Sequence, residues 1–238
     1  MVKSRKILFN PLFLIESSQK LNEKTKKRIT SRLILVENAI SQIEATTGMS
    51  YPEFYIEPVL TLSVSPDDCD EIGILYARTV PLELQGMVRI VVQLSAAFVL
   101  CATKSTLRLV LAHEFLHYVE LVKEFNMGGV LSETSPEYLY EESYHDSERA
   151  FDPQIVFAKE QKLAKDLAKK FQRGIADERL NEKCRTSWIE KGMPTAKIFL
   201  AENQTRIPME ALANTTFDPD VVQFLSNLDS NHTENVIR

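Results

Sequence analysis

Two histidines four residues apart, with a glutamate directly after the first, are the side chains in this sequence best suited to chemistry. His113, Glu114 and His117 lie within the stretch Val110–Val119. In a helix, a separation of four residues is about one turn, so both imidazole rings leave the same face and can share one Zn²⁺. Glu114 lies about 100° around the helix from His113. It is therefore better placed to take a proton from a metal-bound water than to bind the ion itself.

The residues around this motif predict that it lies on a buried helix. Apolar side chains recur there at helical spacing, at Leu107, Val110, Leu111, Phe115, Val119 and Val122. Ser105 or Thr106 could cap the start of the helix, and Gly128-Gly129 follows its expected end. Such a dry setting tunes the pKa of a metal-bound water. The alternative is a helix that carries two histidines by chance, although a buried cluster of this kind needs polar partners.

The segment His113-Glu114-Phe115-Leu116-His117, flanked by Val110, Leu111, Tyr118 and Val119, resembles the extended signature of the zincin metallopeptidases. This resemblance implies a backing helix, a small sheet whose edge strand holds the substrate, the active-site helix, and a later helix that supplies a third ligand. No metzincin-type third histidine and glycine follow the motif. The chain is therefore more similar to the gluzincins, whose third ligand is a downstream carboxylate.

Two glutamates are candidates for this third ligand. Asp152-Pro153 predicts the start of a helix that runs to about Cys184. At about 100° per residue from Phe171, Glu178 falls in the middle of the apolar stripe, where a carboxylate needs a positive partner such as Zn²⁺. Glu178 is the first choice. Glu148 is the alternative and would be a loop ligand.

The segment 130–152 is polar and acidic, and it could form a lid over the cleft or a solvated loop. It contains side chains of the kind that stabilise a developing oxyanion, namely His145 and the tyrosines Tyr138, Tyr140 and Tyr144. Nothing in the sequence selects one of them.

The elements expected around the motif indicate an α+β fold. Residues 19–46 predict a long amphipathic helix that would back the site. Its basic first half could bind an acidic partner or simply face solvent. Strands are expected at 53–64, 72–78 and 88–94, with Pro81 interrupting the stretch between the last two. The strand 88–94 or its neighbour would be the edge strand along which a peptide lies, unless it is an ordinary core strand.

Length and composition limit the class of protein. The chain has 238 residues, of which 44% are hydrophobic, so it can bury one substantial core. We expect a zincin-like metallopeptidase domain at 1–185 and a helical or irregular extension at 186–238, packed on that core. A net charge of −5 argues against nucleic-acid binding. No apolar run approaches the ~18 residues of a membrane span, so no membrane partner is expected.

The three cysteines, Cys69, Cys101 and Cys184, are widely spaced and odd in number. They form no disulfide framework, which favours a reducing, cytoplasmic compartment.

The sequence therefore predicts a Zn²⁺-dependent enzyme that hydrolyses peptide bonds, with a peptide or protein as substrate. His113, His117 and Glu178 would bind the metal, and Glu114 would act as general base. Two alternatives remain open. One is a degenerate zincin fold that binds a peptide or protein without cleaving it. The other is an interaction protein in which the motif arose by chance.

Overall fold

The structure, a computed structural model, describes residues 10–64, 71–126, 137–141, 149–171, 177–199 and 204–236. Helices and small sheets are mixed in an α+β arrangement. The helices are α1 (Phe13–Ser17), α2 (Glu23–Thr47), α3 (Ala96–Cys101), α4 (Lys104–Asn126), α5 (Pro153–Val156), α6 (Gln161–Phe171), α7 (Glu178–Cys184), the π-helix η2 (Arg185–Ile189), α8 (Met209–Ala213) and α9 (Pro219–Val236). The strands are β1 (Glu53–Glu57), β2 (Leu60–Val64), β3 (Glu71–Leu75), β4 (Ala77–Leu84), β5 (Met87–Ser95), β6 (Glu137–Glu141), β7 (Thr195–Phe199) and β8 (Gln204–Pro208).

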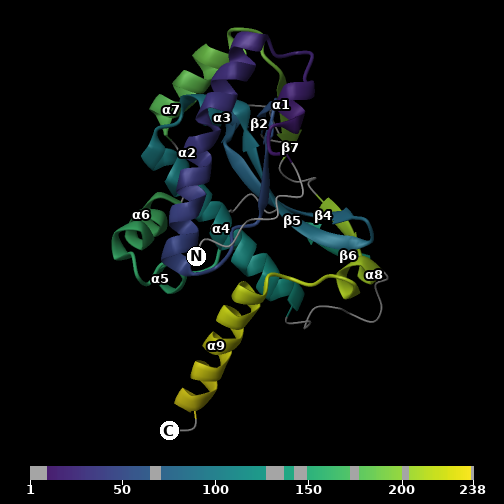
Figure 1. Cartoon of the computed structure of the whole chain (residues 1–238), viewed down its shortest axis with the longest axis vertical. Helices are drawn as coiled ribbons and strands as arrows, with labels where there is room; N and C mark the ends of the chain where they lie inside the picture. The colour runs from purple at the N-terminus through teal and green to yellow at the C-terminus, as the bar shows by residue number, and fades with distance from the viewer. Residues whose placement is uncertain are drawn as a thin grey trace.

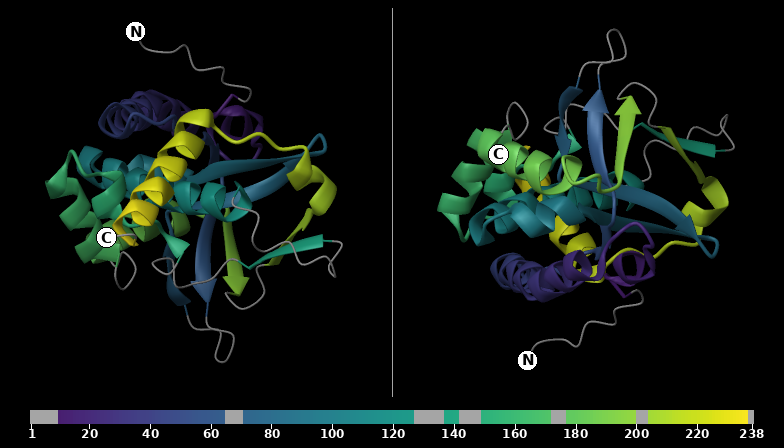
Figure 2. Two further views of the ribbon diagram at one scale, coloured as in Figure 1. Left: turned by 90° about the horizontal axis from the view of Figure 1, so that it is seen from below. Right: turned by 90° about the horizontal axis from the view of Figure 1, so that it is seen from above.

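Helix α4, which carries the His-Glu-His motif, is the element on which the others pack. It contacts α2, α6 and α9, and also strands β4 and β5. Figures 1 and 2 show most of the helices gathered on one side of the molecule and the sheets on the other, with α4 between them. Helix α9 extends away from this body toward the C-terminus (Figure 1). A helix in such a central position needs apolar side chains almost all round, and every residue from Leu109 to Val119 is buried.

The main sheet has the order β1-β5-β4. Strand β5 pairs in parallel with β1 and antiparallel with β4, so β5 is central and β4 lies at one end of the described sheet. The sequence suggested that Pro81 interrupts this region, but β4 runs through it, with Pro81 opposite Ile90. A proline lacks the N–H that a further neighbour would need, so its position is typical of an edge strand.

A second sheet has the order β3-β2-β7, and β6 pairs with β8. The stretch 53–64, expected as one strand, therefore forms two strands that belong to different sheets. The segment after residue 185, expected as a helical or irregular extension, contributes strands to two sheets. Strand β7 pairs in parallel with β2, and β8 pairs antiparallel with β6. Trp188 in the same segment is fully buried.

The backing helix α2 has the termini that its sequence predicts. At its start, the Asn22 side chain accepts a hydrogen bond from the backbone N–H of Thr25, at 2.9 Å. At its end, Gly48 adopts φ 78°, the left-handed conformation of a helix C-cap. Arg32 projects from α2 to the carboxyl end of α3, where its Nε donates to the Val99 carbonyl oxygen at 2.5 Å. This cation meets the negative end of a helix dipole and ties α3 to α2.

The residue that caps the start of α4 is not one of the two predicted ones. Instead of Ser105 or Thr106, Thr103 provides the cap: its Oγ1 accepts from the backbone N–H of Thr106 at 3.1 Å.

The single helix predicted from Asp152 to Cys184 is wrong. Asp152 does cap a helix, and Pro153 is its first residue, but the described residues of this segment form three separate helices, α5, α6 and α7. Within the described ranges, none of the helices combines the length and the apolar character that crossing a bilayer requires.

The carboxylate of Glu160, the residue directly before α6, links α2 and α4 to this part of the chain. Arg108 on α4 makes two hydrogen bonds to Glu160, at 2.8 and 2.5 Å, and Thr46 at the end of α2 donates to the same carboxylate at 3.3 Å. The hydrogen bonds from Arg108 hold the pKa of Glu160 below its usual range.

Glu160→Gln is expected to lower the free energy of unfolding by about 1 kcal/mol at pH 7, because the pair is only partly buried. A carboxylate with a depressed pKa stabilises the fold above its unfolded pKa of about 4.3, and the effect is lost as the pH falls through the lower folded value. Urea unfolding at several pH values will measure this. The difference between the two proteins should shrink below pH 4, and a constant difference would contradict the assignment.

Candidate metal centre

The two histidine rings of the motif face each other across one turn of α4. The Nε2 atoms of His113 and His117 are 3.0 Å apart, and the ring planes are inclined at 83°. Two nitrogen ligands of one tetrahedral Zn²⁺, each bound at about 2.0–2.1 Å, would be about 3.3 Å apart. The separation therefore fits a pair of metal ligands. One Nε2–H can also donate to the other Nε2 at this distance, so the geometry fits a histidine–histidine hydrogen bond as well.

The motif is almost closed off from solvent. His113, Glu114 and His117 are 2%, 3% and 9% exposed. Phe171, the last residue of α6, stacks on the His113 ring with the centroids 3.7 Å apart and the planes 14° from parallel. This contact fixes the orientation of the ring from the side of α6. An orientation held by packing reduces the entropy that a ligand side chain loses when it binds an ion.

The carboxylate of Glu114 is held by a strand. Thr79 of β4 places its Oγ1 2.7 Å from Glu114 Oε2 and 3.0 Å from the Glu114 carbonyl oxygen, and its hydroxyl proton can be donated to either. Thr79 is itself 5% exposed. A buried carboxylate needs such a donor to remain stable. The contact also fixes the direction in which the carboxylate points.

Thr79 was not identified from the sequence. It is one of many threonines in predicted strands, and only the packing of β4 on α4 reveals its partner. Side chains alternate along a strand, so only some residues of β4 can face α4, and Thr79 is one of them. This alternation alone does not identify Thr79 as the partner of Glu114.

Glu178, the first choice for a third ligand, is not brought to the histidines. It is exposed at the start of α7, and among the described residues no group of three histidine, cysteine, aspartate or glutamate side chains could hold a metal ion. The reason is geometric. Helix α7 buries Leu180 and Cys184, and Glu178 precedes Leu180 by two residues, about 200° around the helix. The phase counted from Phe171 does not continue into α7, because Asp177, the residue before α7, has a non-helical backbone with φ −94° and ψ 87°.

The remaining candidates can be placed only in part. Glu148, His145 and Tyr144 lie outside the described residues, whereas Tyr138 and Tyr140 lie in β6, which pairs with β8. The chain returns to α4 just after position 148, where the backbone N–H of Phe151 donates to the Leu116 carbonyl oxygen at 3.2 Å. Leu116 directly precedes His117, so the chain at Phe151 lies beside the motif.

Thr79→Val is expected to lower kcat of a hydrolytic reaction about tenfold and to leave the zinc content unchanged, because it removes the hydrogen bond that positions Glu114. Steady-state kinetics across a pH series will measure this effect. The variant should also shift the acidic limb of the kcat/KM profile, which a purely structural change would not do. Thr79→Ser keeps the hydroxyl and should recover most of the rate. An unchanged pH profile in Thr79→Val would contradict a positioning role.

Comparisons of the chain with protein-family models, with curated proteins and with solved structures found no match. The chemistry of the site is therefore inferred from its own geometry.

Proposed function

We propose that this protein is a zinc-dependent metallopeptidase with a zincin-like core. The observation that carries the proposal is the pair of Nε2 atoms 3.0 Å apart on a buried helix, next to a buried carboxylate that Thr79 holds in place. Two imidazoles and an adjacent carboxylate are the residue types that metal-assisted hydrolysis uses. The packing supports the same assignment, since α2 backs α4 and β4 lies against α4 at an end of its sheet.

Each residue of the motif has a distinct role in this proposal. His113 and His117 would hold the ion. Zinc bound there would supply a Lewis acid that acidifies a water molecule and polarises the scissile carbonyl. Glu114 accepts the proton from the attacking water and passes it to the departing amine. Thr79 bonds to Oε2 and so holds the carboxylate that takes the proton in one orientation.

The edge strand β4 is the proposed binding surface for the substrate backbone. It pairs with β5 at one end of its described sheet, and β8 contacts it without joining that sheet. An extended peptide could add to such an edge through main-chain hydrogen bonds. Thr79 belongs to this strand and bonds to Glu114, so a peptide held along β4 would lie close to the general base.

The third ligand is proposed to be a glutamate downstream of the motif. Glu148 is the better candidate, because it lies three residues before Phe151, whose backbone bonds to Leu116 beside His117. Three extended residues span at most about 11 Å, which is the greatest distance that the chain allows between positions 148 and 151.

Glu148→Ala is therefore expected to lower zinc affinity about 10- to 100-fold, whereas Glu178→Ala should leave it unchanged. Competition with a chromophoric chelator will measure both values. Glu178→Ala is the matched control, because the same residue type is removed from an exposed position. Weaker zinc binding in Glu178→Ala, with unchanged binding in Glu148→Ala, would instead identify Glu178 as the third ligand.

The experiment that tests the function combines metal analysis with peptide cleavage. Protein purified after zinc-replete expression should contain close to one zinc per chain, and a content below about 0.3 would exclude the metal site. Incubation with a mixed peptide library, followed by mass spectrometry, should reveal new termini that are absent from a Glu114→Ala control. Zinc binding without cleavage would favour the alternative, a zincin fold that binds peptides only.

A further inference from the structure

The packing of α7 and η2 on α3 brings together two of the three cysteines, which lie 83 residues apart in the sequence. Cys101 is the last residue of α3 and is partly exposed, and Cys184 is the last residue of α7 and is fully buried. The Lys183 carbonyl oxygen, directly before Cys184, lies 3.7 Å from Cys101 Sγ, and each thiol shifts the pKa of the other, so the two side chains are neighbours. This pair could not be predicted from the sequence, because the spacing of the cysteines matches no known motif.

Several groups around Cys101 favour its thiolate form, whereas burial of the side chain and the Lys183 carbonyl oxygen, which accepts from the protonated thiol, oppose it. Its Sγ lies 2.9 Å from the Ser187 hydroxyl oxygen of η2 and 3.7 Å from the Lys183 carbonyl oxygen of α7. The hydrogen bond from the Cys184 thiol lowers the pKa of Cys101 most, and the Ser187 hydroxyl and the positive charges of Arg28 and Arg32 add to it, to give a pKa of about 6.

The surroundings of Cys184 favour its protonated form. Its hydrogen bond to Cys101 and its burial both raise its pKa, and the charges of Cys101 and Asp177 act in the same direction. The pair therefore consists of an accessible thiolate and a buried, protonated thiol. This combination is typical of a dithiol in which one cysteine attacks and the other resolves the product.

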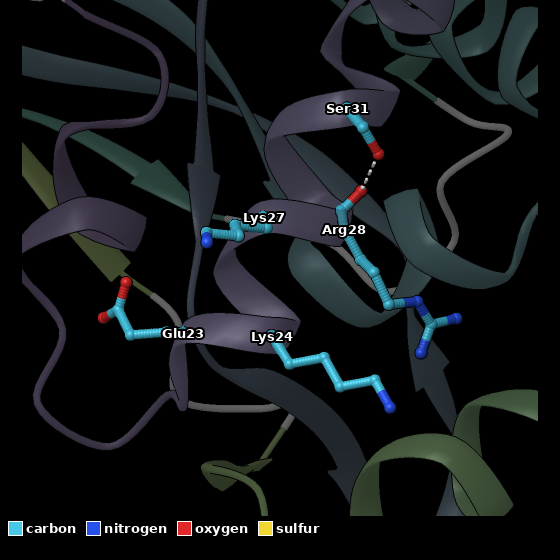
Figure 3. Close-up of a pocket in the computed structure, with 5 residues that line it drawn as sticks. All are labelled: Glu23, Lys24, Lys27, Arg28 and Ser31. Carbon is cyan, nitrogen blue, oxygen red and sulfur yellow. Dashed lines mark hydrogen bonds between the residues drawn. The ribbon is translucent and has the colours of Figure 1, made fainter.

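The basic start of α2 lies beside Cys101. Lys24, Lys27 and Arg28, together with Glu23 and Ser31, line a shallow depression of roughly 440 Å³. Figure 3 shows Lys24 and Arg28 extending to the same side of the helix, whereas Lys27 points away. Arg28 belongs to this depression and also acts on the Cys101 thiolate. The charge at this surface favours a negatively charged reagent.

We propose that Cys101 and Cys184 form a redox-active dithiol that reacts with an anionic low-molecular-weight disulfide, and that Lys24 and Arg28 attract this reagent. The Cys101 thiolate attacks one sulfur of the small disulfide, whose S–S bond breaks and releases one thiolate. Cys184 then loses its proton to solvent and attacks the Cys101 sulfur, which releases the second thiolate. The protein loses two electrons and two protons overall, and the small disulfide is reduced to two thiols.

The oxidised form would join the end of α3 to the end of α7. Only Ala102 and Thr103 separate α3 from α4, so the disulfide would restrain the start of the central helix. Closing a loop of this length should raise the melting temperature by about 5–15 °C. This inference does not depend on the metal site, since neither cysteine belongs to it.

The test uses the full chain with Cys69→Ser, which leaves only these two thiols. After incubation with oxidised glutathione and acid quenching, intact mass spectrometry should show a product that has lost two hydrogens and carries no glutathione. The Cys184→Ser variant should stop at one glutathione adduct. A persistent adduct when Cys184 is present, or a disulfide-linked dimer as the main product, would overturn the dithiol.

A second measurement does not require the buried cysteine to be replaced. In the protein with both thiols, the rate of Cys101 alkylation by iodoacetamide, followed by peptide mapping, should have its midpoint near pH 6. A midpoint at pH 8–9, as in an ordinary thiol, would overturn the proposal.

The choice of an anionic reagent is tested with a cationic one. Lys24→Gln with Arg28→Gln should slow the reaction with oxidised glutathione several-fold more than the reaction with cystamine, because the loss of Arg28 raises the pKa of Cys101 for both reagents but the loss of attraction affects only the anionic one. Equal slowing of both reagents, or of neither, would overturn the recruitment of an anionic disulfide.

Discussion

Glu114→Gln is expected to lower kcat for peptide hydrolysis by about 10³-fold while zinc binding is retained. Glutamine has nearly the same shape as glutamate, and its amide oxygen can still accept the hydrogen bond from Thr79 that holds Oε2 in the structure. It cannot take a proton from water. The substitution therefore removes the proposed chemical role and keeps the packing of a side chain that is only 3% exposed.

The matched control is Glu120→Gln, six residues later on the same helix. Glu120 is partly exposed and bonds to Lys123 at 3.1 Å, so its replacement should leave kcat within a factor of about two. Cleavage of a fluorogenic peptide and metal analysis of each protein provide the two readouts. Equal rates in Glu114→Gln and the unmodified protein would mean that Glu114 is not the base, or that a contaminant cleaves the peptide.

The elements that position the motif could largely be predicted from the sequence, because each is specified by local patterns. Gly48 ends α2 as expected, Asp152 and Pro153 begin α5, and the apolar residues around the motif bury α4. Strand β5, expected at 88–94, runs from Met87 to Ser95. Caps and hydrophobic periodicity act within a few residues, so a single sequence contains the information needed.

The predictions that were wrong depended on continuity over a longer range. The apolar spacing from Ala164 to Ile175 suggested one helix that reaches Cys184, but α6 ends at Phe171. One break changes the phase of every later residue, and this is why Glu178 is exposed. Hydrophobic spacing predicts which face of a helix is buried only as long as the same helix continues.

Contacts between distant elements could not be predicted from spacing at all. Thr79 bonds to Glu114 across 35 residues, Phe171 stacks on His113, and Cys101 meets Cys184. Each pair depends on how α4 and α3 pack against β4, α6 and α7. The residue types of the candidate centre could be read from the sequence, but the groups that orient them required the fold.

The same packing bears on the alternative that the motif arose by chance. Burying an imidazole pair and a carboxylate in an apolar helix is unfavourable unless each finds a partner. Glu114 has Thr79, and the two Nε2 atoms have each other or a shared ion. A histidine–histidine hydrogen bond alone would satisfy two polar atoms, yet hydrophobic residues of similar size would stabilise the core at least as well.

His117→Ala is expected to abolish cleavage and to lower zinc content from about one per chain to below about 0.1. The thermal response separates a metal ligand from a histidine that only bonds to its neighbour. If zinc is present at about 1,000 times its Kd, it stabilises the fold by about 4 kcal/mol, so 1,10-phenanthroline should lower the melting temperature of the unmodified protein by about 8–16 °C.

The His117→Ala variant should already melt at a lower temperature and should not respond to the chelator. Differential scanning calorimetry with and without chelator measures both effects. If the two Nε2 atoms served only each other, the substitution would still destabilise the protein, because it leaves His113 without this partner, but chelation would change neither melting temperature. The chelator response of the unmodified protein therefore decides between a metal centre and a buried hydrogen bond.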